Sequence, residues 1–356
     1  MEPGTSKKKI RLDLSAQAEK YARPDAPLKI RQMAARGALP LEPLDLASLL
    51  FALAHDADED VREAARASLA GLPREILAPV LSGPAHPALL SHLARIHRED
   101  PDVCEALALN PAASDLTVAF LATLPIRGVV DIVSNNQERL EREPRIVEAL
   151  GENPLTGRAV IERILDFLGL APKDVEEGPP RAQPSEAEAA RAIAAVLGEA
   201  SLDTARLLAS EEDARLEETT DNLFAAIQKM NVMQKIKLAR MGGKEARNLL
   251  VKDRNKIVAL AALQSPKITE IEVIAMAQSR AVSDEILRVI ANNRDWTRSY
   301  PIKLALSTNP KTPLPQAVKF LNYLQDRDLR SLMKSKDVST TISTHARRIL
   351  DKKGRA

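Results

Sequence analysis

Four segments of the chain share one order of residues, and their spacing restricts the fold. In each, Asn-Pro or Ser-Pro follows an apolar run, a Ser or Thr comes two or three residues after the proline, and a second apolar run begins. Proline cannot continue a helix and a hydroxyl side chain caps the next one, so each segment predicts a helix, a sharp turn and a second helix. The prolines are Pro111, Pro154, Pro266 and Pro310.

The first two of these prolines are 43 residues apart and the last two are 44 residues apart. We expect this length to hold one antiparallel helix pair with its connections. Self-similarity at such a period is typical of stacked helical repeats, in which each repeat packs only on its neighbours. The spacing therefore predicts a helical array over much of the chain.

Composition favours the same fold class. Hydrophobic residues make up 45% of the 356 residues, but aromatic residues only 3%. A core built mainly from Ala, Leu, Ile and Val suits close helix packing, whereas a large β-sandwich would need more aromatic and β-branched residues. The chain is predicted to be all-α, and its length allows two domains or one elongated array.

Local signals place several helix ends. Asp60 is predicted to cap a helix in which Val61, Ala65 and Leu69 line one face. Thr269 with Glu272 fits a capping box, and Thr312 followed by Pro313 predicts a cap with proline at the first helical position. Gly242 and Gly243 predict a helix C-cap and a turn.

The stretch from His55 to Pro73 resembles the second helix of a HEAT repeat, because an acidic turn precedes Val-Arg and then Ala and Leu at helical spacing. The Asn-Pro turns are similar to those of the leucine-rich-repeat-variant relatives of that family. The resemblance covers roughly two thirds of the chain. It implies a HEAT-like helical-repeat solenoid and hardly restricts the function. The family's iron–sulfur module needs clustered cysteines, and Cys104 is the only cysteine here.

The charge is divided unevenly along the chain. Residues 222–356 contain 26 Lys and Arg against 11 Asp and Glu, whereas residues 1–221 contain 25 against 38. Residues 171–189 are rich in proline and acids, which is typical of a linker. We predict a disordered tail (1–27), an N-terminal repeat arm (28–170), this linker (171–189), a basic C-terminal repeat arm (190–350) and a short disordered tail (351–356).

Loops of the basic arm are the candidate binding site. Two charged loops stand ahead of repeat helices, and one of them contains the only tryptophan of the chain. Basic loops along a repeat array attract acidic partners or neutralise phosphates, and a tryptophan can anchor either kind of contact. The predicted partner-binding residues are Lys252, Arg254, Lys256, Arg294, Trp296 and Arg298.

Two functions stay open at this stage. The first is a non-catalytic interaction scaffold that docks a protein partner on its helical-repeat surface. The alternative is sequence-independent nucleic-acid binding through the basic C-terminal arm. The two differ in salt dependence, because each phosphate contact releases counterions.

Other classes of function have little support in the sequence. No converging catalytic residues, no cofactor motif and no metal-ligand set are found, so we expect neither an enzyme nor a cofactor or small-molecule substrate. No apolar segment approaches the roughly 20 residues that span a bilayer. The single cysteine and the lack of a signal peptide predict a cytoplasmic location.

Overall fold

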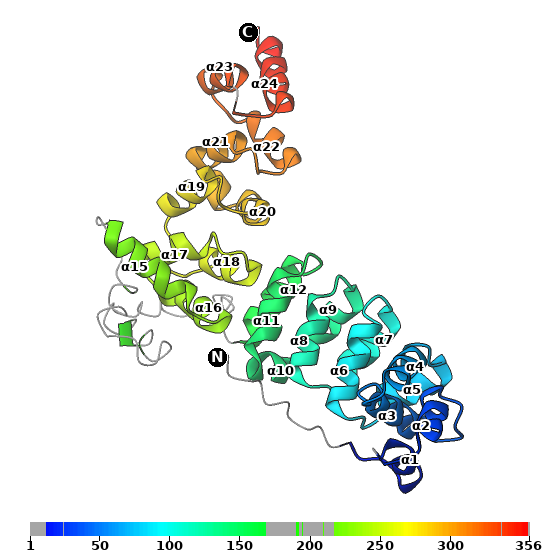
Figure 1. Ribbon diagram of the computed structural model, residues 1–356. Coiled ribbons are helices and arrows are strands. Elements are labelled where there is room, and N and C mark those ends of the chain that lie inside the picture. Colours follow the sequence, from blue (N-terminus) through cyan, green and yellow to red (C-terminus); the bar gives the residue numbers. More distant parts are fainter. Residues whose placement is uncertain are drawn as a thin grey trace. The chain divides into compact units, whose positions relative to one another are not determined.

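A computed structural model describes residues 12–23, 25–168, 190, 191, 194, 209, 217–335 and 337–354 of the chain (Figure 1). These residues form 22 α-helices and one short 3₁₀ helix, and no strand is found among them. The predicted all-α class is confirmed. None of the described helices is long and apolar enough to cross a membrane.

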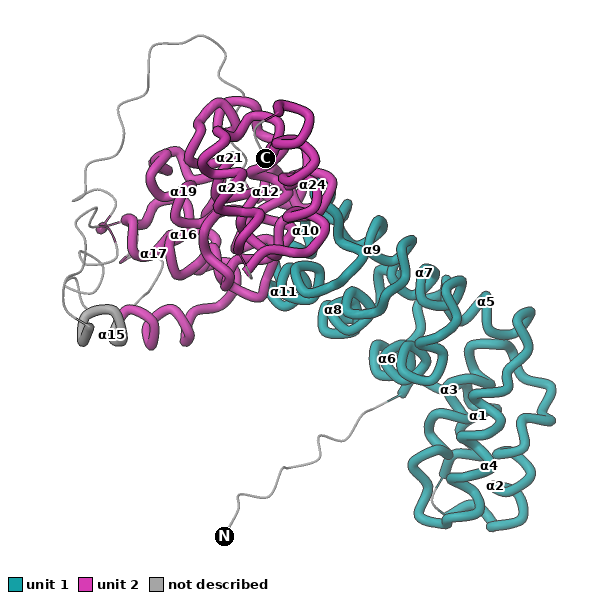
Figure 2. Tube along the Cα trace, turned by 90° about the horizontal axis from the view of Figure 1, so that it is seen from above, with its two compact units in different colours: residues 1–160 teal, residues 161–356 magenta. Residues whose placement is uncertain are grey.

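The chain divides into two compact units, Met1–Val160 and Ile161–Ala356, which Figure 2 colours separately. The division falls inside α12 (Arg158–Phe167). The predicted linker, 171–189, lies outside the described residues. The helices of unit 1 that precede α12 are α1 (Ala16–Ala22), α2 (Leu28–Ala35), α3 (Pro43–Leu53), α4 (Glu59–Ala70), α5 (Arg74–Ser82), α6 (Pro87–Ile96), α7 (Pro101–Leu109), α8 (Asp115–Thr123), α9 (Arg127–Ser134), α10 (Gln137–Arg142) and α11 (Pro144–Glu152).

Unit 2 continues after α12 with ten more α-helices in its described part. They are α15 (Glu217–Gln228), α16 (Val232–Met241), α17 (Lys244–Leu250), α18 (Lys256–Leu263), α19 (Glu270–Gln278), α20 (Asp284–Asn292), α21 (Tyr300–Thr308), α22 (Leu314–Leu321), α23 (Asp326–Lys334) and α24 (Thr340–Lys352), with the 3₁₀ helix η1 (Trp296–Arg298) between α20 and α21.

The repeat contains three helices and not the expected pair. Between Pro266 and Pro310 lie α19, α20 and α21, and between Pro111 and Pro154 lie α8, α9 and α11, with the short α10 inserted. The first helix of each group packs against the third, as α8 does on α11, α16 on α18 and α19 on α21. The middle helices, α9 and α20, are only eight and nine residues long, and none of the four prolines that define the period marks them.

Each Asn-Pro step folds into the same turn. The Asn110 side-chain oxygen accepts a hydrogen bond from the backbone N–H of Ala112 (2.7 Å), and its backbone oxygen accepts one from Ala113 (3.2 Å). The same two bonds recur at Asn153 and Asn309. The asparagine therefore shapes the reversal that proline permits.

The amide of the same asparagine also ties the repeat together. Asn153 is 1% exposed, and its Nδ2 donates to the backbone oxygens of Ala122 and Leu124, both at 2.7 Å, at the end of α8. Asn110 and Asn309 hold the corresponding two carbonyls at the ends of α5 and α19. We call Asn110, Asn153 and Asn309 the clamping asparagines, because each satisfies carbonyl groups that a helix C-terminus leaves open.

At the fourth turn, two residues replace the clamping asparagine. The corresponding carbonyls belong to Arg240 and Gly242 at the end of α16. The hydroxyl of Ser265 donates to the first (3.0 Å) and Nη1 of Arg247 donates to the second (2.8 Å). Arg247 is fully buried and pairs with Glu272, with Nε–Oε1 2.8 Å and Nη2–Oε2 3.1 Å.

Burial by itself would raise the pKa of Glu272, but hydrogen bonds from Arg247 and Thr269 outweigh it and hold this pKa below its usual value. The carboxylate therefore stays charged opposite a buried arginine, which is the condition under which a buried ion pair is tolerated. The capping box predicted for Thr269 and Glu272 is confirmed, and it is part of this buried network.

The other predicted helix ends are partly corrected. Gly242 is the C-cap of α16, as predicted, but Asp58 and not Asp60 caps α4. Thr312 does not cap α22, which begins at Leu314, and its hydroxyl has no hydrogen-bond partner although the residue is buried. Proline at position 313 moves the start of the helix one residue further than the pattern indicated.

Two helices reach into the predicted tails. Ser15 caps α1, and Ala18 in that helix is fully buried against neighbours of unit 1, within the range predicted as a disordered tail. Leu14, Tyr21 and Ala22 pack against the same core, so this segment is held by several apolar contacts. At the other end, α24 extends to Lys352.

Candidate interaction surface

Five of the six predicted partner-binding residues lie on connections between the second and third helices of a repeat, and Lys256 is the first residue of such a third helix. Three follow α17 and three follow α20, so they occupy equivalent places in consecutive repeats. The first connection carries Lys252, Arg254 and Lys256, and the second carries Arg294, Trp296 and Arg298.

The first connection is held by its acidic and amide residues, not by its cations. Asp253 pairs with Lys235 of α16 (Oδ2–Nζ 2.9 Å) and accepts a hydrogen bond from the N–H of Asn255. Asn255 is buried and caps α18. Lys252 and Arg254, on either side of Asp253, are exposed.

Lys256 differs from these two cations. It is the first residue of α18, it is partly buried, and its Nζ lies 3.6 Å from a carboxylate oxygen of Glu285. The contact joins α18 to the first turn of α20. Lys256 is thus engaged within the fold, and the basic surface of this connection consists of Lys252 and Arg254.

The second connection is a hydrogen-bonded turn organised by Asn293. The side-chain oxygen of Asn293 accepts hydrogen bonds from the N–H groups of Asp295 (2.9 Å) and Trp296 (3.2 Å). Its backbone oxygen accepts one from the hydroxyl of Thr297 (2.7 Å). Trp296 is partly buried at the start of η1, with the exposed Arg294 and Arg298 on either side. We call Arg294, Trp296 and Arg298 the arginine–tryptophan turn.

The two connections are separated by α20. Lys256 contacts the first turn of this nine-residue helix, and the arginine–tryptophan turn follows its last residue. At 1.5 Å per residue, α20 places roughly 13 Å between them. The predicted residues therefore form two groups at opposite ends of one helix.

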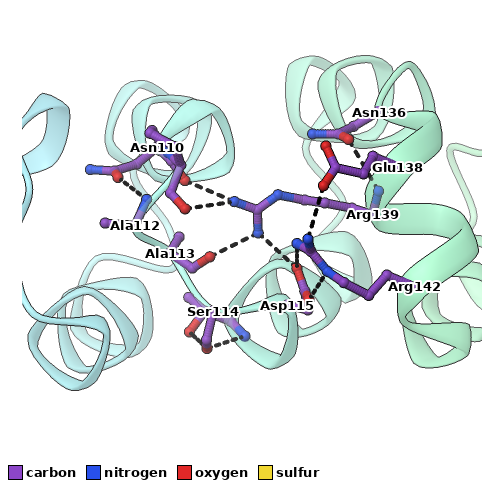
Figure 3. Close-up of polar contacts among 11 residues, drawn as sticks. Asn110, Ala112, Ala113, Ser114, Asp115, Asn136, Glu138, Arg139 and Arg142 are labelled. Carbon is purple, nitrogen blue, oxygen red and sulfur yellow. Dashed lines mark hydrogen bonds and ion pairs between the residues drawn. The ribbon is translucent and has the colours of Figure 1, made fainter.

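The equivalent connection of unit 1 uses its arginines differently (Figure 3). Arg139 of α10 is buried, and its guanidinium donates to the backbone oxygens of Asn110 (3.1 Å) and Ala113 (2.8 Å) and to Asp115 (3.1 Å). Arg142 donates hydrogen bonds to both oxygens of the same carboxylate, with Nε–Oδ2 2.7 Å and Nη2–Oδ1 2.8 Å. The hydrogen bond from Arg142 holds the pKa of Asp115 below its usual value, against a smaller opposing effect of burial.

Arg142 in unit 1 and Arg298 in unit 2 can be compared directly, because they occupy the same position in their repeats. Arg142 and Arg298 each precede a clamping asparagine by eleven residues. Arg142 is bound to Asp115 of α8, whereas the carboxylate beside Arg298 is Asp295, at 3.5 Å, and both side chains of that pair are more than 80% exposed. Exposed pairs of this kind contribute little to stability.

A surface hollow in unit 1 is lined mainly by charged side chains. It encloses about 690 Å³ near the start of α7, and its guanidinium and carboxylate groups pair with one another, as Arg74 does with Asp100 and Asp102. Burial lowers the pKa of His97 on its wall. Cys104, which donates to the backbone oxygen of His97 (3.4 Å), is buried, and burial raises its thiol pKa to about 11. A protonated, buried thiol is a poor nucleophile.

Metal binding finds no support in the part of the chain that the structure describes, where no group of three or more His, Cys, Asp or Glu side chains is placed to hold an ion. Searches of protein-family models, of curated proteins and of solved structures found no match to this chain. The site is therefore interpreted from its own geometry.

Two residues of unit 2 were not predicted from sequence. Lys303 of α21 and Tyr323, just after α22, form a contact of ammonium and ring at 5.2 Å. Their separation of 20 residues carries no local signal. Only the packing of α21 on α22 brings them together.

Proposed function

We propose that this protein is a non-catalytic scaffold of HEAT-like helical repeats in two arms, and that the second arm docks a protein partner. The arginine–tryptophan turn carries this proposal. It offers a tryptophan between two arginines, which are residue types enriched among the side chains that dominate binding energy at protein interfaces.

The preorganisation of this turn supports the same function. Asn293 and Thr297 fix the backbone before any partner arrives, so binding would lose little conformational freedom there. The exposed cations favour an acidic partner surface, because opposite charges speed the encounter and exclude wrong partners. Lys252 and Arg254, at the other end of α20, extend the positive surface.

The test is capture of partners from cell extract by the full-length protein, with nuclease present to remove partners bridged by nucleic acid. The variant is Arg294→Glu with Arg298→Glu. The matched control is Lys229→Glu with Lys334→Glu, which reverses two other exposed cations of unit 2. We expect a discrete protein that the wild type and the control retain and the variant loses by about tenfold or more. Equal retention by all three proteins would contradict the proposal.

A further inference from the structure

Tyr323 is an exposed aromatic residue around which three elements meet. It lies two residues after the end of α22 and is 58% exposed. The Nζ of Lys303 lies 5.2 Å from its ring centroid and also donates a hydrogen bond to the backbone oxygen of Arg298 (3.3 Å). The end of η1, α21 and the end of α22 thus converge on one accessible ring.

The chain around this ring is strongly basic. Residues 286–325 contain six Lys or Arg and a single acid, Asp295, which already pairs with Arg298. Lys319 is exposed in the last turn of α22, four residues before Tyr323. The next acids along the chain are also engaged, since Asp326 pairs with Lys353 and Asp328 accepts a hydrogen bond from Tyr300.

We infer that Lys303, Lys319 and Tyr323, here called the basic–aromatic patch, bind single-stranded nucleic acid. An exposed ring with the Lys303 ammonium against it and the exposed Lys319 four residues earlier in the chain matches the two requirements of a single strand, phosphate neutralisation and stacking of an unpaired base. A duplex keeps its bases stacked on one another and offers the ring no free face. The patch reads no sequence, because every base has a face that can stack.

This function is separate from the docking of a protein partner, since none of the three patch residues belongs to the arginine–tryptophan turn. The two sites adjoin, because Lys303 of the patch donates a hydrogen bond to the backbone oxygen of Arg298 in the turn. Variants of the two sites keep the two proposals distinguishable.

The experiment is fluorescence anisotropy of the full-length protein with labelled 20-nucleotide oligo(dT) and oligo(U). We expect saturable binding at about 50 mM salt that weakens about tenfold at about 200 mM. Tyr323→Leu should weaken binding at least about fivefold, while Tyr323→Phe, which keeps the ring, retains it. Lys303→Gln and Lys319→Gln should each lower the logarithmic salt slope by about 0.7.

The control is Lys334→Gln, which removes an exposed cation of α23 outside the patch and should leave the affinity unchanged. An unchanged melting temperature shows that each variant is folded. The inference is overturned by a lack of saturable binding at the lower salt. It is also overturned if Tyr323→Leu binds like Tyr323→Phe, or if a duplex of the same length binds as tightly. Loss of a captured protein with Tyr323→Leu, without any oligonucleotide binding, would assign the patch to a protein interface.

Discussion

The connection between α9 and α11 and the connection between α20 and α21 occupy the same place in their repeats but use arginine in opposite ways. In unit 1, the buried Arg139 binds Asp115 and the carbonyls of the Asn110 turn, and the half-exposed Arg142 binds both oxygens of Asp115. In unit 2, Arg294 and Arg298 remain exposed. The first pair stabilises the fold, and the second pair is available for binding.

The difference depends on what lies at the start of the first helix of each repeat. Asp115 is the first residue of α8 and receives both arginines of unit 1. The first residue of α19, Glu270, is also an acid but is exposed, and the buried acid of the same turn, Glu272, pairs with Arg247. The same kind of charged loop is therefore structural in one unit and free in the other.

The largest expected effect is the loss of a structural arginine. Arg139→Met should destabilise unit 1 by about 3 kcal/mol, because it leaves the buried carbonyls of Asn110 and Ala113 without their donor and removes one of the two arginines that bind Asp115. Arg298→Met should change the stability of unit 2 by less than about 0.5 kcal/mol. The two units need not unfold together, so the stability of each is measured separately. Hydrogen exchange of the amides in α8 reports the stability of unit 1, and that of the amides in α21 reports the stability of unit 2. If both substitutions change the stability of their units equally, the arginines of the two connections do not differ in their structural role.

A clamping asparagine should matter almost as much as a structural arginine. Asn153→Ala removes two hydrogen bonds to the end of α8 and leaves its carbonyls buried, so a loss of about 2 kcal/mol is expected. The matched control is Asn292→Ala, because Asn292 is an exposed residue in the last turn of α20. Denaturant unfolding of both variants tests the prediction. An Asn153→Ala protein as stable as the control would show that the clamp does not hold the repeat together.

Acid should weaken the structural contacts. The pKa of Asp115 is lowered in the folded state, so its contribution to the free energy of unfolding is complete above about pH 4, where the unfolded chain is also ionised. The contribution is lost as the pH falls through the folded-state pKa. Unfolding measured between pH 6 and pH 2.5 should show this loss, and Asp115→Asn should flatten its part of the curve. An unchanged curve would mean that the pairing with Arg142 contributes nothing to stability.

The smallest expected effect is a gain in stability. Thr156 and Thr312 follow clamping asparagines by three residues, are buried, and have hydroxyls without hydrogen-bond partners. Ala113 is the buried residue at the same position of another turn. Thr156→Val keeps the shape and removes the buried hydroxyl, so stability should rise by about 1 kcal/mol. Thermal unfolding measures the change in stability. The control is Thr123→Val, which removes a hydroxyl that donates a hydrogen bond to the backbone oxygen of Phe120 and should not raise the stability.

Much of the fold could be predicted from the sequence, because its signals are local. The prolines at a regular period, the Thr269 capping box and the Gly242 cap act within a few residues of themselves. The packing of the first helix of each repeat on the third, and the clamping role of asparagine, could not be predicted in this way. Asn153 acts on carbonyls 29 and 31 residues earlier, and only packing brings those groups together.

The candidate site shows the same limit. Sequence placed the six residues on connections, but it could not separate Lys256, which is engaged by Glu285, from the exposed Lys252 and Arg254. It also gave no sign that Arg139 is structural, because its acceptor Asp115 lies 24 residues away. Composition predicts where charge accumulates, whereas the fold decides which charges are already paired.

The most direct test of the central claim compares two matched positions by photo-crosslinking. A photoreactive amino acid is placed at position 294 or at position 138 of the full-length protein, because Arg294 and Glu138 are exposed and each precedes a clamping asparagine by fifteen residues. We predict a discrete, nuclease-resistant protein adduct from position 294 and none from position 138. No adduct from position 294, or the same adduct from both positions, would contradict the account.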